Sequence, residues 1–217
     1  MSVKISDTTV IVDTGCANLN SVRYAFERLG ASVVVTDDLA QIKAATRVVV
    51  PGVGTAKAAM ASLNNKGLVD TLVSLTQPVL GVCLGMQMLT NQSQERGDTE
   101  QDCQCLGLID TQIALLDSQG LPLPHMGWNQ ITATDHPLFA GIEAGSYVYF
   151  VHSYRAPLSD YTIASSTYGE RFSAAIAKDN FMGVQFHPEK SAEVGAKILQ
   201  NFLNMGESQA PLMEASQ

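Results

Sequence analysis

Apolar residues in this chain follow two alternating patterns. Short runs of β-branched and aliphatic residues predict buried strands, and the first four of them lie at 8–12, 31–36, 47–50 and 78–82. Between the first two runs, a helix ending before Gly30 is predicted by apolar residues at helical spacing: Leu19, Val22, Phe26 and Leu29. Strands that alternate with helices predict an α/β fold with a mostly parallel central sheet flanked by helices.

Strand patterns become denser in the second half of the chain. They occupy 112–115, 130–132, 146–150, 161–164 and 172–176. We expect these strands to be antiparallel additions to the same core, because no linker or repeat separates them from the first half. Apolar residues between Val194 and Leu203 predict a closing helix. We therefore predict one domain over residues 1–204, followed by a loose tail over residues 205–217.

Composition limits the function more than it defines it. The chain has 217 residues and a formal net charge of −8, which argues against DNA, RNA or an anionic membrane as the main partner. Neither an N-terminal targeting run nor a membrane-spanning segment is evident, so the cytoplasm is the expected location. Four cysteines in a chain of this length do not predict a disulfide framework.

The first candidate for chemistry is Cys83, which follows an apolar strand in the pattern Gly81-x-Cys83-x-Gly85. This is the thiol counterpart of the Gly-x-Ser-x-Gly nucleophile elbow, a sharp strand-to-helix turn that lifts the nucleophile above the sheet. A cysteine at a helix N-terminus is surrounded by unpaired N–H groups, which favour the thiolate. Taken alone, a cysteine after a strand is more often a buried packing residue.

The second candidate is the segment His187-Pro188-Glu189, and another apolar strand is expected to end at this histidine. In α/β sheets, functional groups gather at the carboxyl ends of the strands, so His187 and Cys83 are predicted to meet. Glu189 would then orient the imidazole. Taken singly, His187 would be a buried histidine and Glu189 a solvated turn residue; together with Cys83 they predict a catalytic triad.

A third strand ends in Pro51-Gly52-Val53-Gly54. Acyl transfer requires backbone N–H groups that stabilise an oxyanion. The N–H of Leu84 and the segment Gly52–Val53 are the predicted oxyanion hole. The alternative is an ordinary strand-to-helix turn.

These segments resemble the class I glutamine amidotransferases. The resemblance rests on GVCLGMQ at 81–87, FHPEKS at 186–191 and PGVG at 51–54, and it extends from about residue 8 to about residue 204. Three further segments are similar to the glutaminase subunits of imidazole glycerol phosphate synthases, a branch of that family: 12–22, 125–129 and 149–154. The pair Cys16-Ala17 departs from the Met-Gly or Leu-Gly usual there.

The resemblance implies hydrolysis of glutamine to glutamate and ammonia through a cysteine thioester, without a cofactor or metal. It also implies that glutamine is bound by Gln87, Glu95, Ser153 and Tyr154. The segment around Thr90-Asn91-Gln92 departs from the family pattern, so a surface loop charge is the alternative for Glu95.

The resemblance further implies a partner. A (β/α)8 cyclase subunit would use the ammonia in histidine biosynthesis to make imidazole glycerol phosphate and AICAR. Four residues are the predicted docking face of this heterodimer: Met126, Trp128, Asn129 and Tyr149. Packing in the core or in a loop is the alternative, since aromatic and Met residues occur in cores and interfaces alike.

Three alternatives remain at this stage. The chain resembles, less closely, the glutaminase subunits of anthranilate synthase and pyridoxal phosphate synthase, which share the triad but not the segment 125–129. A non-enzymatic regulatory subunit is disfavoured because Cys83 and His187 are both present.

Cys103-Gln104-Cys105 has the spacing of half a metal site, but a closed zinc site needs four ligands and no second pair lies nearby in sequence.

Overall fold

The fold is built around one large mixed sheet, seen in a computed structural model that describes residues 7–15, 19–95 and 101–205. Its strand order is β2-β1-β3-β4-β13-β12-β11-β8-β9. The first five pair in parallel: β2 Ser32–Thr36, β1 Thr8–Val12, β3 Arg47–Gly52, β4 Val79–Cys83 and β13 Phe181–Val184. The next four pair antiparallel: β12 Glu170–Lys178, β11 Thr162–Tyr168, β8 His125–Ala133 and β9 Ser146–His152. The expected fold class is confirmed.

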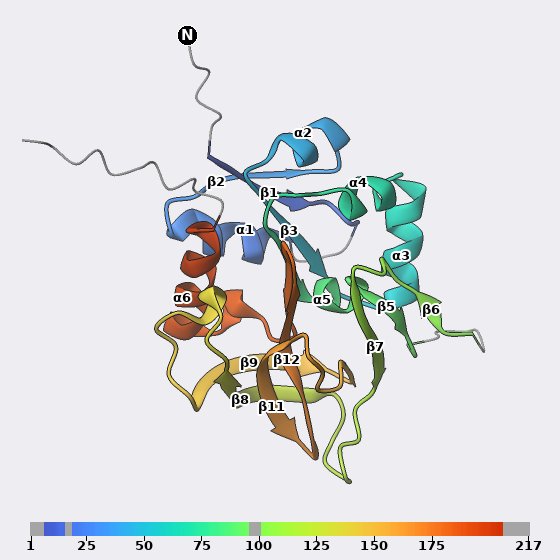
Figure 1. Cartoon of the computed structure of the whole chain (residues 1–217), viewed down its shortest axis with the longest axis vertical. Helices are drawn as coiled ribbons and strands as arrows, with labels where there is room; N and C mark the ends of the chain where they lie inside the picture. The colour runs from blue at the N-terminus through green and yellow to red at the C-terminus, as the bar shows by residue number, and fades with distance from the viewer. Residues whose placement is uncertain (1–6, 16–18, 96–100, 206–217) are drawn as a thin grey trace, which may run out of the picture.

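Helices cover both faces of the parallel half of the sheet (Figure 1). On one face, α1 Leu19–Arg28 packs against α6 Ala192–Leu203, and their apolar side chains join Ile11 in one buried cluster. Side chains of Val10 and Val12 belong to a second cluster, because successive strand residues point to opposite faces. That second cluster is covered by α2 Leu39–Ala44, α3 Ala56–Asn65, α4 Val69–Val73 and α5 Leu84–Met88.

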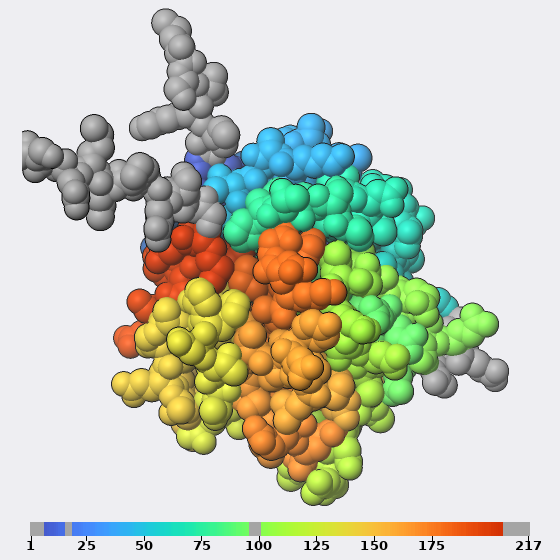
Figure 2. Space-filling model, in the orientation of Figure 1, coloured from blue at the N-terminus to red at the C-terminus, as the bar shows by residue number. Residues whose placement is uncertain are grey.

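In the space-filling view, the helices beside the parallel strands and the antiparallel strands occupy different parts of the molecule. Helices α2 to α4, in blue to teal, form its upper part, and the antiparallel strands, in yellow to orange, form its lower part (Figure 2). Within the described ranges, no helix is long and apolar enough to cross a membrane.

A second sheet was not predicted from the sequence. Its order is β10-β7-β5-β6, with bounds β10 Tyr154–Arg155, β7 Ile109–Leu115, β5 Thr90–Ser93 and β6 Cys103–Gln104. The run 112–115 belongs to this second sheet, where it pairs in parallel with β5 and antiparallel with β10, so its expected place in the core sheet is wrong. Strand β5 has the polar sequence TNQS, which carries no apolar alternation to reveal it.

Some observed boundaries of strands and helices differ from the expected ones by a few residues. Strand β13 ends at Val184, three residues before its predicted end at His187, and two short 3-10 helices follow strands: η1 Pro137–Phe139 and η2 Pro188–Lys190. Residues 206–217 of the predicted tail and Cys16-Ala17 lie outside the described residues.

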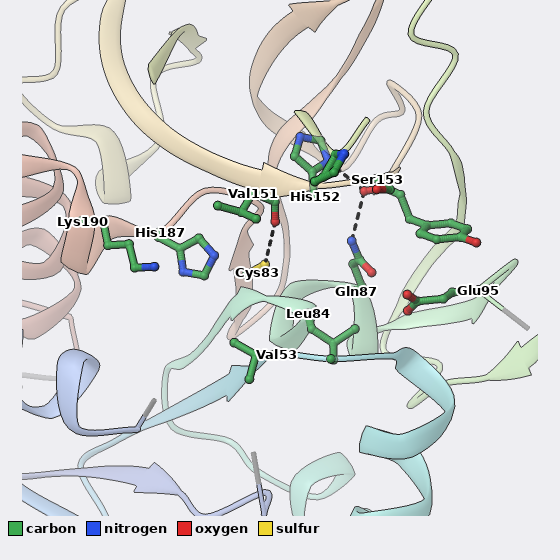
Figure 3. Close-up of a pocket in the computed structure, with 13 residues that line it drawn as sticks. Val53, Cys83, Leu84, Gln87, Glu95, Val151, His152, Ser153, His187 and Lys190 are labelled. Carbon is green, nitrogen blue, oxygen red and sulfur yellow. Dashed lines mark hydrogen bonds between the residues drawn. The ribbon is translucent and has the colours of Figure 1, made fainter. Parts of the chain in front are cut away.

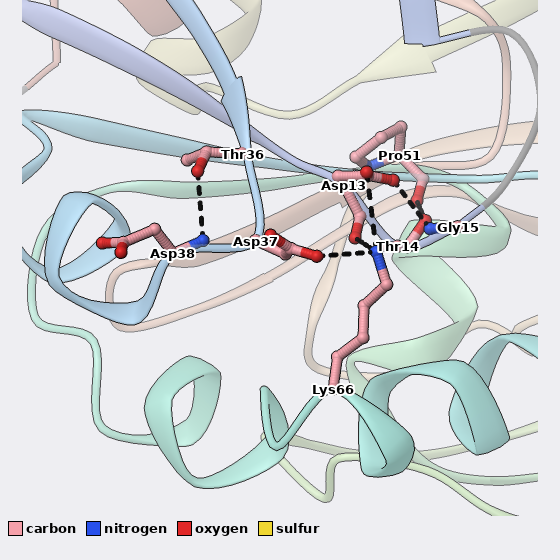
Figure 4. A network of polar contacts seen from close by, with 8 residues as sticks. All are labelled: Asp13, Thr14, Gly15, Thr36, Asp37, Asp38, Pro51 and Lys66. Carbon is pink, nitrogen blue, oxygen red and sulfur yellow. Dashed lines mark hydrogen bonds and ion pairs between the residues drawn. The ribbon is translucent and has the colours of Figure 1, made fainter.

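Polar groups tie together the carboxyl ends of β1 and β2 (Figure 4). Lys66, just after α3, donates to the Asp13 carbonyl at 2.8 Å and to the Asp37 carboxylate at 3.0 Å. Its hydrogen bond and charge lower the pKa of Asp37, and Asp37 in turn raises the pKa of Lys66. Thr14 Oγ1 donates to the Pro51 carbonyl at 3.4 Å. The network therefore anchors the loop after β1 beside the Pro51 end of β3.

The short helix α5 packs very closely against the sheet. A Cβ built on Gly85 would lie 1.8 Å from the Val50 carbonyl oxygen, and one built on Gly81 would lie 2.7 Å from the Gly85 backbone. Only glycine leaves room for these contacts. Register places Gly52 of β3 opposite Cys83 of β4, and Val184 of β13 opposite Val82. Three strand ends, and the residues that follow them, therefore meet at one edge of the sheet.

This packing predicts a large cost for Gly85→Ala. The added methyl group overlaps the backbone of β3, so we expect a loss of about 3 kcal/mol or more in the free energy of unfolding, measured by urea denaturation. Gly67→Ala is the matched control, because Gly67 has a φ of +65° with nothing within 4 Å of an added Cβ. Backbone strain alone should cost that variant about 1–2 kcal/mol. Equal losses in the two variants would contradict the close approach.

Candidate active site

Cys83 occupies the junction of β4 and α5 in an uncommon backbone conformation. Its φ is 54° and its ψ is −111°, in the half of backbone space that residues other than glycine rarely adopt. Such strain persists only where the surrounding structure enforces it, and it is concentrated at active sites. The segment Gly81-x-Cys83-x-Gly85 thus has the backbone geometry of a nucleophile elbow.

The thiol opens onto a cavity of about 360 Å³ (Figure 3). Most of the predicted site residues line this cavity: Val53, Cys83, Leu84, Gln87, Glu95, Ser153, Tyr154 and His187. Gly52 and Glu189 line a smaller cavity that shares Val53 and His187 with the first. The structure therefore brings together side chains from β4, α5, the loop after β9 and the turn after β13.

His187 is held in place from several sides. Its Nδ1 lies 2.9 Å from Glu189 Oε1, and the 3-10 turn at Pro188 places both side chains on the same side of the backbone. The backbone N–H of His187 donates to the Tyr149 carbonyl at 2.9 Å, and Ser191 Oγ donates to the His187 carbonyl at 2.7 Å. With Nδ1 occupied by Glu189, Nε2 is the ring nitrogen left for Cys83.

Charge interactions favour a protonated His187. Burial acts to lower its pKa, but hydrogen bonding and charge attraction from Cys83 and Glu189 outweigh burial and raise the pKa to about 10. From the sequence, the helix N-terminus is the expected source of positive charge beside the thiol. Helix α5 has only five residues, so its dipole is small, and the imidazolium is the stronger positive group beside the sulfur.

The negative charge of the buried Glu189 carboxylate is compensated by His187. Its side chain is 3% exposed, and none of the described residues gives its Oε2 a hydrogen bond. A buried carboxylate with one unpaired oxygen is costly unless a positive group lies close by. The bond to His187 therefore stabilises the carboxylate as well as the imidazolium.

Gln87 is fixed by bonds within the protein. Its Nε2 donates to the Tyr154 carbonyl at 3.1 Å and to Gln185 Oε1 at 2.9 Å. Both amide hydrogens are thereby used, which leaves the Oε1 side for a ligand. Ser153 and Tyr154 line the same cavity as Gln87. The Ser153 carbonyl accepts a hydrogen bond from the Leu116 N–H at 2.9 Å.

Glu95 lies in the cavity wall and is half-buried. Its Oε2 accepts from the N–H of Ala56, the first residue of α3, at 2.7 Å. Burial raises the pKa of this carboxyl, and the bond from Ala56 partly offsets that effect. Glu95 is therefore a half-buried residue of the cavity wall, and its contact with glutamine stays a prediction.

Gln185 is a residue that the sequence analysis missed. It is fully buried, and its Nε2 lies 3.8 Å from Cys83 Sγ while its Oε1 accepts from Gln87. The sulfur also lies 3.7 Å from the Val151 carbonyl oxygen, which can accept a hydrogen bond from it only in its protonated form. An uncharged polar residue between Val184 and Phe186 was the available signal, since a buried Gln needs partners.

The predicted docking residues lie on the β8–β9 hairpin, at the edge of the large sheet. Met126 and Trp128 are 61% and 52% exposed, and the Trp128 ring meets Tyr149 edge-on at 6.0 Å between centroids. Lys190, from the turn beside His187, has its Nζ 5.9 Å from the Tyr149 ring centre. An aromatic surface thus adjoins the cavity.

Asn129 is not part of that exposed surface. Side chains alternate along a strand, so Asn129 points to the face opposite Trp128. There its Nδ2 donates to the Thr167 carbonyl at 2.9 Å. The structure therefore separates Asn129 from the other three predicted docking residues.

Cys103 and Cys105 lie on and beside β6, outside the lining of the 360 Å³ cavity. Both are free cysteines, and burial raises the pKa of Cys105 to about 12. In the part of the chain that the structure describes, no group of three or more His, Cys, Asp or Glu side chains is placed to hold a metal ion.

Comparisons with known proteins identify the family. The sequence model of "Glutamine amidotransferase class-I" matches residues 10–205. The chain is 73% identical over 202 residues to "Imidazole glycerol phosphate synthase subunit HisH" of Shewanella loihica, covering 91% of this chain and 90% of the relative. The protein of the same name from Shewanella sediminis is 72% identical over 197 residues, covering 91% and 90%. The chain belongs to the class I glutamine amidotransferases, in the HisH family. The resemblance read from the motifs is confirmed.

Solved structures show the same fold in more distant members. A crystal structure of a glutamine amidotransferase superposes on this class I amidotransferase with a TM-score of 0.70 at 15% sequence identity, covering 92% of this chain and 99% of the other. The mixed sheet and its flanking helices are therefore the common framework of these proteins.

The ionisation of His187 can be measured directly. Its pKa of about 10 lies above the ordinary value of 6.5, so its cation stabilises the fold fully below pH 6.5, and this contribution is lost as the pH rises through about 10. In Glu189→Gln, a neutral amide replaces the carboxylate, and the pKa of His187 should fall. An NMR titration of the His187 ring should show this fall. The His136 ring should titrate in the same way in the wild type and in the variant. An unchanged pKa in the variant would contradict the charge pairing.

Proposed function

We propose that this chain hydrolyses glutamine to glutamate and ammonia, with Cys83 as nucleophile, His187 as general acid and base, and Glu189 as the group that orients His187. The observation that carries the proposal is the strained Cys83 elbow, whose thiol shares a cavity with His187, which is in turn bonded to Glu189. The family membership supports the same chemistry.

The first half of the reaction forms a thioester. The Cys83 thiolate attacks the side-chain carboxamide carbon of glutamine, and a carbon–sulfur bond forms while the carbonyl oxygen becomes an oxyanion. Collapse of this intermediate breaks the carbon–nitrogen bond. His187, protonated through its interactions with Cys83 and Glu189, gives its proton to the leaving nitrogen, and ammonia is released.

The oxyanion needs backbone donors at the same place. We assign this role to the N–H groups of Leu84 and of the segment Gly52–Val53, because β3 and β4 set Gly52 opposite Cys83. The turn that follows contains Gly54 with a φ of +94°, which lets the segment change conformation at low cost. We infer that this segment reaches its productive geometry only when the partner is loaded with its nucleotide, which would limit wasteful hydrolysis.

The second half of the reaction releases glutamate. His187, now neutral, takes a proton from water as the water oxygen attacks the thioester carbon. The carbon–sulfur bond then breaks, glutamate leaves, and the thiolate–imidazolium pair is regenerated. Glutamine is held during both steps by Gln87, Glu95, and the backbone of Ser153 and Tyr154. Glu95 is the candidate for the α-amino group, since it supplies a carboxylate in the cavity wall.

Ammonia needs a protected acceptor, because in bulk water most of it would be protonated and lose its nucleophilicity. We propose that a (β/α)8 cyclase subunit docks on Met126, Trp128 and Tyr149 to form a heterodimer, receives the ammonia through a channel, and makes imidazole glycerol phosphate and AICAR in a lyase reaction. The exposed aromatic surface beside the cavity supports this site of docking. A working thiol also fits the reducing cytoplasm.

The names of the HisH relatives favour this assignment over the anthranilate and pyridoxal phosphate synthase subunits. The presence of Cys83, His187 and Glu189 in one site disfavours a purely regulatory subunit.

Cys83→Ala in the reconstituted complex with the cyclase tests the function. Without the sulfur no thioester forms, so glutamine-driven synthesis should fall by about 10³-fold or more, while synthesis from added ammonia stays within about twofold of the wild type. Cys103→Ala, which removes a thiol outside the cavity, is the matched control and should leave both rates unchanged. Retained glutamine-driven synthesis would reject the nucleophile, and loss of both activities would indicate a structural role.

A further inference from the structure

Two buried histidines lie beside the cavity and have no part in the mechanism above. His125 is on β8 and His152 ends β9, and they are 2% and 6% exposed. His125 Nδ1 lies 2.9 Å from His152 Nε2, and His152 Nδ1 lies 2.9 Å from the Tyr154 carbonyl oxygen. At the other end, Asn129 Nδ2 lies 3.2 Å from His125 Nε2.

Aromatic rings enclose the pair. The His125 ring stacks between Tyr168 and Phe150, with ring centroids 4.1 Å and 4.9 Å away. Burial lowers the pKa of His125 to about 4 and that of His152 to about 3. Both rings are therefore neutral at neutral pH, and each carries one proton.

The neighbours of the pair determine where each proton lies. The Tyr154 carbonyl can only accept, so His152 Nδ1 must carry the proton, and His152 Nε2 must accept. His125 Nδ1 then has to donate to that nitrogen, which leaves His125 Nε2 as an acceptor for the Asn129 amide. Each bond in this chain has one permitted direction, and both histidines are protonated at Nδ1.

The chain of bonds continues to the thiol. The Tyr154 carbonyl, which accepts from His152, also accepts from Gln87 Nε2 at 3.1 Å. Gln87 Nε2 donates to Gln185, whose own amide nitrogen lies 3.8 Å from Cys83 Sγ. Figure 3 shows His152 and Gln87 converging on the backbone beside Ser153. The imidazole of His152 thus holds the carbonyl that orients Gln87.

We propose that His125 and His152 are positioning residues for the glutamine site, acting as a pair of neutral Nδ1-protonated imidazoles that fix the Ser153–Tyr154 backbone and the Gln87 amide. A neutral imidazole suits this role because it offers one donor and one acceptor on opposite sides of a rigid ring. The two side chains of the pair also join Asn129 of the β8–β9 hairpin to the substrate cavity, which His152 lines. This inference rests on the proposed glutaminase function.

The protonation pattern is tested on the wild-type protein by ¹⁵N NMR of the histidine side chains at pH 7. We expect two of the four histidines, assigned as His125 and His152, to be neutral with the proton on Nδ1. A proton on Nε2 of either ring, or a charged ring, would overturn the proposal. This readout does not depend on activity or on any substitution.

Two isosteric variants test the positioning role in the complex with the cyclase. In His152→Asn, the amide nitrogen stands near the former Nδ1 and keeps the bond to the Tyr154 carbonyl, whereas in His152→Gln the polar group stands near Nε2 and that bond is lost. We expect the KM for glutamine to rise about tenfold or more in His152→Gln and by less than about threefold in His152→Asn, with a smaller effect on kcat.

His136→Asn is the matched control, because His136 caps the 3-10 helix η1 away from the cavity and should leave the KM unchanged. Equal or reversed effects of the two His152 variants would overturn the positioning role. Synthesis from added ammonia should survive in both, which separates a changed glutamine site from a misfolded subunit. Absence of glutaminase activity in the wild-type complex would instead reject the proposed function, whatever the NMR result.

Discussion

The functional account depends on the pairing of one thiol with one imidazole at the carboxyl ends of β4 and β13. Cys83 reaches that position only because α5 lies almost directly on the sheet, where glycines at 81 and 85 allow backbone contacts that a Cβ would block. The strained conformation of Cys83 follows from this packing, since the chain must turn sharply to leave β4 and enter α5. Packing energy spread over the whole α/β core thus maintains a local conformation that the cysteine would not adopt alone.

Charge is distributed unevenly among the buried histidines, and hydrogen-bond partners explain the difference. His187 faces a carboxylate and a thiol, so its cation is favoured despite burial. His125 and His152 face each other, aromatic rings and a carbonyl. Burial lowers the pKa of both, and for His152 it outweighs the opposing hydrogen bond to the Tyr154 carbonyl, so both stay neutral. In the proposed mechanism, the same residue type is therefore a proton donor at His187 and, by the proposed positioning role, a rigid polar support at His152, and both of these residues line the same cavity.

Motifs with a local mechanism could be predicted from the sequence. The elbow around Cys83 and the His187-Pro188-Glu189 turn each have their geometry encoded within a few residues, and the parallel strands before them are strongly apolar. Less could be predicted where partners come from distant segments. The polar strand β5 has no apolar pattern, Gln185 gains its meaning only from Gln87 and Cys83, and the direction of the His125–His152 bond depends on the Tyr154 carbonyl. Asn129 directly follows Trp128 on β8, so side-chain alternation places it on the opposite face and away from the predicted docking surface.

The most direct test of the central claim is to trap the covalent intermediate. The complex would be mixed with glutamine, quenched in acid within the turnover time, and digested for mass spectrometry. The account predicts one glutamyl group attached to the peptide that contains Cys83. It predicts no such group on that peptide in controls incubated with glutamate in place of glutamine. Rapid formation of glutamate with no adduct on Cys83, or with the adduct on another residue, would contradict it.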